Sequence, residues 1–107
     1  MITAELYFAQ GSDDPAGFRV SGHTGTSGQS VVCAAVSSAC YMAANTITEI
    51  LGVDADVSVC DGYMSVIVDG DGIPKSKAIL EGLRLHLEQL ADQYPKQIKL
   101  NFLEVHQ

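Results

Sequence analysis

The most restrictive feature of this sequence is a change in the spacing of its apolar residues along the chain. Over residues 2–8 apolar and polar residues alternate, and they do so again over residues 18–20, which indicates half-buried strands. From residue 31 to about residue 51 the apolar residues recur every three or four positions, which predicts an amphipathic helix. A chain with both spacings must combine a sheet with helices.

The second half of the chain is expected to contain two more strands, a second helix and a last strand. One strand is predicted before Asp61-Gly62 and one after it, because this dipeptide is typical of a two-residue hairpin turn. Leucines at helical spacing then predict a second helix, which begins near Pro74 and ends near Tyr94. The predicted order of elements is therefore β-β-α-β-β-α-β.

This order predicts an α+β fold, a two-layer sandwich in which two helices pack on one face of a mainly antiparallel five-stranded sheet. In the last strand we expect Ile98, Leu100 and Phe102 to face the helices. The opposite face is expected to keep polar groups and some apolar side chains that a second subunit could cover. These apolar side chains are Met64, Val66, Val68 and Leu103.

Composition and length indicate one globular domain that spans residues 1–107. Apolar residues make up 47% of the 107 residues and charged residues 18%. The chain shows no apolar run near the roughly 20 residues of a membrane helix, and its N-terminus lacks the pattern of a secretory signal. Three cysteines without a CxxC pair favour a reducing compartment. We therefore expect a cytoplasmic protein that does not bind a membrane.

The net charge of −7 narrows the class of partner. Binding to nucleic acid depends on Lys and Arg side chains at the phosphates, so direct nucleic-acid binding is disfavoured. An acidic protein can attract a basic peptide or protein segment, although such a charge also serves solubility alone.

A cysteine and a histidine are the candidate catalytic residues. If the first helix starts near Ser30, Cys33 lies in its first turn, where free backbone N–H groups and the helix dipole favour a thiolate. His23 follows the second strand, so it is a candidate base for activating that thiol. Gly25 and Gly28 lie between them and would allow close approach of a substrate. A buried structural cysteine and a solvated histidine are the alternative interpretation.

Other kinds of site fit the same residues poorly. The glycine-rich loop lacks the GK[ST] ending of a phosphate-binding P-loop, and residues 69–72 lack the remaining ligands of a calcium loop. His23, Cys33 and Cys40 do not have the spacing of metal ligands, and core packing is the favoured role of Cys40. A Ser/His/Asp site is also disfavoured, because no nucleophile-elbow motif surrounds Ser30 or Ser37. We expect neither a metal nor a cofactor.

The segment that carries this pair resembles the ribosomal-processing cysteine protease Prp family. That family has a Gly-His-Ala-Gly stretch, then a glycine-containing loop and Asp-Ile-Val-Cys-Ala-Ala-Val-Ser at the head of a helix. The similar residues here are Gly22-His23-Thr24-Gly25 and Ser30-Val31-Val32-Cys33-Ala34-Ala35-Val36-Ser37.

The resemblance implies a thiol protease in which His23 is the base and Cys33 the nucleophile. Residues Gly22, Gly25, Gly28 and Ser30 would then belong to the loop that contacts substrate. It also implies a homodimer that acts in ribosome biogenesis by removing a short N-terminal extension from large-subunit ribosomal protein twenty-seven. A non-catalytic, ribosome-associated binding module of the same fold is the alternative, and a phosphate-ligand binder is a third.

Two positions depart from the family pattern. The acidic residue three positions before the cysteine is replaced by Ser30, which can still cap a helix but carries no charge to orient an imidazolium. Thr24 replaces the usual alanine. The change at Ser30 leaves three consequences open: weaker activity, a different orienting residue, or another substrate.

Overall fold

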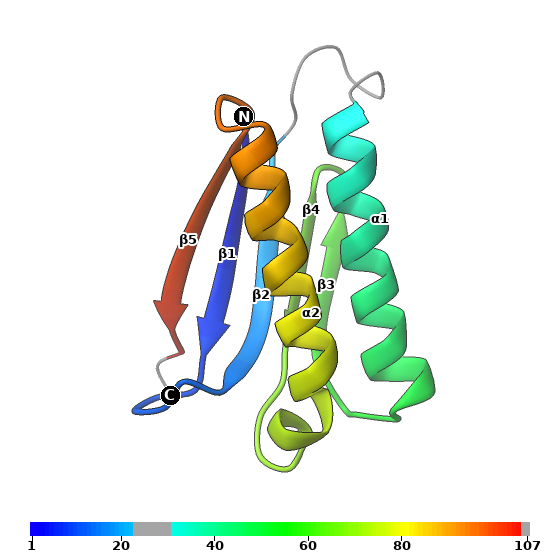
Figure 1. Ribbon diagram of the computed structural model, residues 1–107. Helices are drawn as coiled ribbons and strands as arrows, with labels where there is room; N and C mark the ends of the chain where they lie inside the picture. The colour runs from blue at the N-terminus through cyan, green and yellow to red at the C-terminus, as the bar shows by residue number, and fades with distance from the viewer. Residues whose placement is uncertain (23–30, 106–107) are drawn as a thin grey trace.

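The computed structural model describes residues 1–22 and 31–105, and its elements follow the predicted order (Figure 1). A short π-helical segment, η1, extends the first helix. The elements are β1 (Ile2–Phe8), β2 (Pro15–Ser21), α1 (Val31–Asn45), η1 (Thr46–Ile50), β3 (Asp56–Cys60), β4 (Tyr63–Ile67), α2 (Gly72–Gln93) and β5 (Ile98–Glu104).

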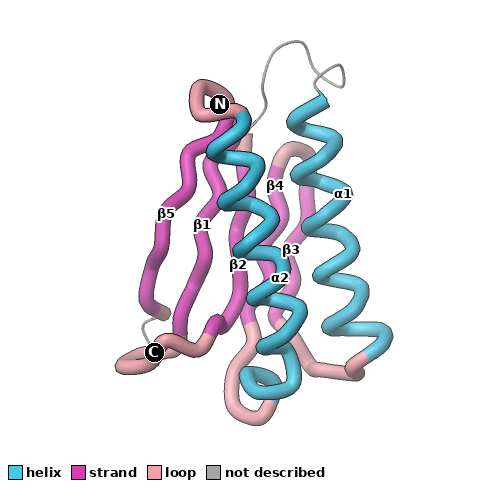
Figure 2. Tube along the Cα trace, viewed as in Figure 1, coloured by secondary structure: helices cyan, strands magenta, loops and turns pink. Residues whose placement is uncertain are grey.

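The five strands form one sheet in the order β3-β4-β2-β1-β5. β1 pairs with β5 in parallel, and the other three pairs of neighbours are antiparallel. Both helices lie on the same face of this sheet, so the molecule has two layers (Figure 2). The prediction of a two-layer α+β sandwich with a mainly antiparallel sheet is therefore confirmed.

The core lies between the sheet and the two helices. In β1 the alternating residues Ile2, Ala4 and Leu6 are buried, as their spacing predicted. Phe18 of β2 is fully buried in the same layer. From α2 the core receives leucines at helical spacing: Leu80, Leu83, Leu87 and Leu90.

The prediction that Met64, Val66 and Val68 lie on the open face of the sheet was wrong. All three are buried in the core beneath the helices. In the register between β2 and β4, Val20 lies opposite Met64 and Phe18 opposite Val66. Directly paired residues share a face of the sheet. Because Phe18 and Val20 face the helices, the residues of β4 opposite them do so too.

The end of β5 corrects the prediction for Phe102. Its ring is on the helix side, as expected, but the residue is 50% exposed. It lies at the sheet edge beside Phe8, with ring centroids 6.1 Å apart, and α2 contributes the guanidinium of Arg84 above it at 5.9 Å. The ring stays partly in contact with water because β5 is an edge strand, and the guanidinium interacts with one of its faces.

The first helix changes its hydrogen-bonding pattern near its end. The backbone N–H of Leu51 donates to the carbonyl oxygen of Thr46 at 2.8 Å, a spacing of five residues. The hydroxyl of Thr46 also donates to the carbonyl oxygen of Met42 at 2.7 Å. Gly52 follows with a φ of 64°, the left-handed conformation that glycine commonly adopts just after a helix.

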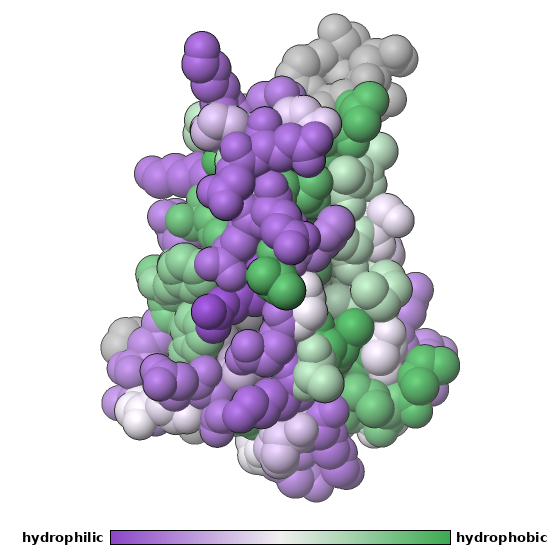
Figure 3. Space-filling view, viewed as in Figure 1, coloured by the Kyte–Doolittle hydropathy of each residue, from purple (hydrophilic) through white to green (hydrophobic). Residues whose placement is uncertain are grey.

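The continuous helix Val31–Ile50 is long and apolar enough to cross a membrane by length and composition alone, contrary to our expectation. A stretch of 18 residues within it has a mean hydropathy of 1.4, to which alanine, valine and cysteine contribute most. In the space-filling view apolar side chains gather along α1, whereas the outer side of α2 is hydrophilic (Figure 3). The helix nevertheless packs on the sheet through buried residues: Val32, Val36, Cys40, Ala43, Ala44 and Ile47.

Candidate functional site

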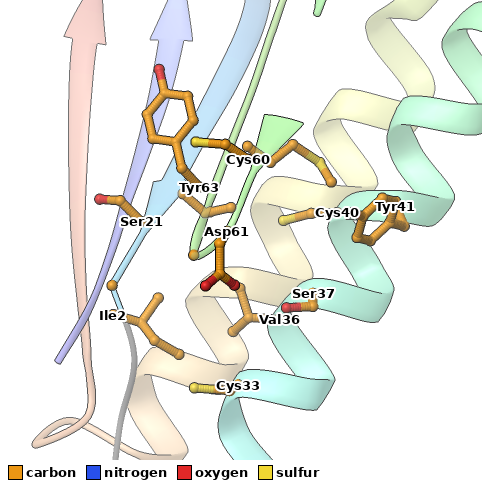
Figure 4. Close-up of a pocket in the computed structure, with 14 residues that line it drawn as sticks. Ile2, Ser21, Cys33, Val36, Ser37, Cys40, Tyr41, Cys60, Asp61 and Tyr63 are labelled. Atoms are coloured by element: carbon orange, nitrogen blue, oxygen red, sulfur yellow. The ribbon is translucent and has the colours of Figure 1, made fainter. Parts of the chain in front are cut away.

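A cavity of about 210 Å³ opens where α1 begins. One wall is the first half of α1, and the other is formed by the start of β1, the end of β2 and the turn between β3 and β4 (Figure 4). Apolar side chains such as Val20, Val36 and Met64 line it together with polar groups. The cavity therefore combines apolar walls with access from solvent.

Cys33 is the third residue of α1, lines this cavity and is only partly buried. Its predicted position in the first turn of the helix is confirmed. Backbone N–H groups in a first turn lack helical acceptors, so a negative charge on sulfur is stabilised there. The position suits a thiolate nucleophile that a substrate can reach.

Gly22 borders the cavity at the end of β2, and its backbone leaves little choice of residue. It has a φ of 93°, and a Cβ at this position would lie 2.4 Å from the carbonyl oxygen of Met1. Its N–H donates to the carbonyl oxygen of Gly62 at 3.1 Å, in the turn between β3 and β4. Only glycine accepts this geometry without strain, so Gly22 holds the end of β2 against that turn.

The remaining predicted site residues lie outside the described part of the chain. These are His23, Gly25, Gly28 and Ser30. Their proposed roles therefore stay predictions.

The two other cysteines differ sharply from Cys33. Cys40 is fully buried, as predicted, and burial raises the pKa of its thiol from 9.0 to about 12. Cys60 is exposed at the end of β3 and also lines the cavity. Within residues 1–22 and 31–105, no three His, Cys, Asp or Glu side chains gather in a way that could hold a metal ion.

Asp61 lines the cavity, although the sequence indicated only a turn residue at this position. Its carboxylate points from the hairpin turn toward α1, where Ser37 faces the same space (Figure 4). The helical spacing of four from Cys33 could have indicated Ser37. Nothing local in the sequence indicates Asp61, because its position depends on how the hairpin packs against α1.

A partly exposed cysteine in the first turn of a helix, facing a cavity that solvent can enter, is placed where a nucleophilic thiol can meet a substrate. The chain belongs to the cysteine protease Prp family, whose model matches residues 1–99. The protein is therefore a cysteine protease.

Solved structures share its fold. An essential ribosomal processing protease Prp from S. aureus, in complex with a covalently linked product peptide, has a TM-score of 0.84 at 22% identity, covering 95% of this chain and 99% of that one. The same protease with a substrate peptide gives 0.80 at 21% identity and the same coverage. SMU.848 from Streptococcus mutans gives 0.77 at 22% identity, covering 98% and 96%. No curated protein matches.

Proposed function

We propose that this protein is an endopeptidase that removes the N-terminal extension of large-subunit ribosomal protein twenty-seven. Cys33 is the nucleophile and His23 the base. The observation that carries the proposal is Cys33 itself, partly exposed in the first turn of α1 and facing the cavity. Two structures with the same fold are of a ribosomal processing protease bound to a peptide, which supports this choice of substrate.

In the proposed reaction His23 accepts the proton of the Cys33 thiol, and the thiolate attacks the scissile carbonyl carbon. Backbone N–H groups at the start of α1 donate hydrogen bonds to the resulting oxyanion. His23 then gives its proton to the leaving amine, and the peptide bond breaks. Water hydrolyses the thioester, which releases the new carboxyl end and restores the Cys33 thiol.

The cavity supports an apolar residue next to the scissile bond. Its walls include Val20, Val36 and Met64, and transfer of an apolar side chain from water to such a surface is favourable. The net charge of −7 would attract a basic segment on the other side of the scissile bond. Both features suit a substrate with an apolar residue before the cut and a basic segment after it.

We also infer a cytoplasmic homodimer. The sheet face away from the helices bears Tyr7, Ile67 and Leu103, of which Leu103 is 38% exposed. A second subunit on this face would cover these side chains. Light scattering coupled to size exclusion tests the dimer, and Leu103→Lys should weaken it.

The test of the proteolytic function is incubation with the host's full-length ribosomal protein, followed by mass spectrometry. We expect one new N-terminus, produced by the wild-type protein and abolished in Cys33→Ala. Cys60→Ser is the matched control, because Cys60 lines the same cavity from the opposite wall. Cleavage that survives Cys33→Ala, or an intact ribosomal protein after incubation with the wild type, would overturn the proposal.

A further inference from the structure

The edge strand β3 is unusually open for a strand with apolar side chains. It is the last strand on one side of the sheet, and all five of its residues are exposed. Val57 and Val59 are 41% and 50% exposed although they pair with the core residues Val66 and Met64. Edge strands are commonly protected by lysine, proline or a bulge, and β3 contains neither lysine nor proline.

The hydrogen bonds of β4 show which way the backbone of β3 points. The N–H of Gly22 donates to the carbonyl oxygen of Gly62, and the N–H of Val68 to that of Ala16. Backbone groups alternate in direction along a strand, so the even-numbered residues of β4 bond toward β2.

The odd-numbered residues of β4 therefore bond toward β3, where they pair with Asp56, Ser58 and Cys60. The N–H and C=O groups of Val57 and Val59 must then point away from the sheet, toward solvent. No other described segment pairs with them, since β3 is the end of the sheet. Such a row of free donors and acceptors is a template for one more strand.

This edge leads directly to the cavity that holds the nucleophile. Cys60, the last residue of β3, lines the same cavity as Cys33, and Tyr41 of α1 lines it beside Ser37 (Figure 4). Figure 1 shows β3 beside α1, with its end at the turn near the start of that helix. A peptide extended along β3 would thus run into the cavity.

The charges around this edge have one sign. Asp54, Asp56 and Asp61 lie in or next to β3, and residues 53–63 contain no lysine or arginine. The ion pairs of the described residues involve other carboxylates. An extended chain with apolar residues in its middle and lysine or arginine at its flanks complements such a strand.

We propose that β3 is the docking strand for the substrate, which binds as an extended segment and becomes a sixth strand of the sheet. Backbone groups of the segment bond to Val57 and Val59, and its cationic side chains lie near the aspartates. This assignment rests on the proposed proteolytic function and deepens it, because it says how the peptide is held beside Cys33.

Amide hydrogen exchange followed by NMR tests the docking strand without altering it. The Cys33→Ala protein is saturated with a synthetic peptide that spans the extension and the first mature residues of the host's ribosomal protein. Exchange at Val57 and Val59 should slow about tenfold or more, because each amide gains an acceptor. The amide of Ser58 is the internal control, since it already bonds to β4 and should change little.

A variant with one lost donor gives a second measurement. Val59→Pro removes an N–H that points outward and leaves the pairing with β4 in place. We expect kcat/KM for the peptide to fall about fivefold to tenfold, the effect of one hydrogen bond. Val59→Thr, which has the N–H and a side chain of similar shape, should recover most of the loss seen in Val59→Pro. Unchanged thermal melting shows that both variants are folded.

The outcomes separate the two proposals. Cleavage of the peptide without slowed exchange at Val57 and Val59 overturns the docking strand and leaves the proteolytic function standing. Slowed exchange without cleavage by the wild type overturns the proteolytic function alone. If neither slowed exchange nor cleavage is observed, both proposals are overturned. Slow exchange in the free protein that disappears on dilution means that a second copy occupies β3, which also overturns the docking strand.

Discussion

Cys33 and Cys40 lie two turns apart on the same helix, and both line the cavity, yet they are chemically opposite. Cys33 is partly exposed and lies in the first turn, where backbone N–H groups have no acceptor within the helix. Cys40 is fully buried, and its thiol has a pKa of about 12. The comparison teaches that position along the helix and access to water, and not residue type, decide which thiol can react.

The largest expected effect is on alkylation. At neutral pH iodoacetamide should modify Cys33 at least about a thousandfold faster than Cys40, because the thiolate is the reactive form. Peptide mass spectrometry over a time course measures both rates. Cys40 should react quickly only after denaturation in guanidinium. Equal rates in the folded protein would contradict the distinction between the two thiols.

The next effect concerns the wall opposite Cys33. Gly22→Ala places a Cβ 2.4 Å from the carbonyl oxygen of Met1, at a φ of 93°. We expect it to lower the free energy of unfolding by about 2–4 kcal/mol and also to slow alkylation of Cys33. Urea unfolding and the alkylation assay measure the two effects.

Gly17→Ala is the matched control for Gly22→Ala, because its Cβ would lie 2.1 Å from the carbonyl oxygen of Val66, away from the cavity. It should destabilise the protein to a similar degree. Its folded fraction should keep the wild-type reactivity of Cys33. If both variants alter that reactivity alike, Gly22 has no specific role at the cavity.

A smaller effect is the pH dependence of stability caused by Cys40. Its thiol is protonated in the folded protein up to about pH 12, whereas the unfolded chain releases the proton above about pH 9. Unfolding is therefore favoured as pH rises from about 9 toward 12, by up to about 1.4 kcal/mol per pH unit. Below pH 8 the contribution is absent.

Urea unfolding at several pH values measures this slope, and the comparison with Cys40→Ala isolates it from other titrating groups. The variant should be less stable at neutral pH by about 1–2 kcal/mol, because the core loses a buried sulfur. It should also lose less stability than the wild type above pH 9. Parallel curves for the two proteins would mean that Cys40 ionises as readily in the folded state.

The smallest expected effect concerns the carboxylate of Asp61 in the cavity that Cys33 and Cys40 line. Asp61→Asn keeps the size of the side chain and removes its charge from the cavity. We expect kcat/KM to fall about threefold for a peptide with lysine or arginine near the cut and to change little for a neutral analogue. The difference should shrink in high salt. Equal effects on both peptides would assign Asp61 a role other than charge recognition.

Most of the architecture could be predicted from local spacing. The alternation of Ile2, Ala4 and Leu6 and the helical spacing of Val32 and Val36 describe elements that bury one face whatever their neighbours are. Likewise the place of Cys33 in a first turn follows from where the helical spacing begins. The family was identified from residues 22–25 and 30–37, and the family model confirms it.

The errors arose where the answer depended on pairing. Spacing shows that Met64 and Val66 share a face of their strand, but not which face of the sheet this is. Phe102 has the correct face but lies at an edge, where α2 provides Arg84 above the ring. The cavity position of Asp61 required the packing of a hairpin on a helix distant in the sequence.

By itself, then, the sequence determined the order of strands and helices, one buried stripe on each, and a cysteine at a helix start, because these depend on neighbours within a few residues. Only the tertiary structure decided that β3 is an open edge, that Met64 and Val66 face the helices and that Asp61 joins the cavity of Cys33. These features arise from contacts between segments far apart in the chain, which the packing of the whole domain selects.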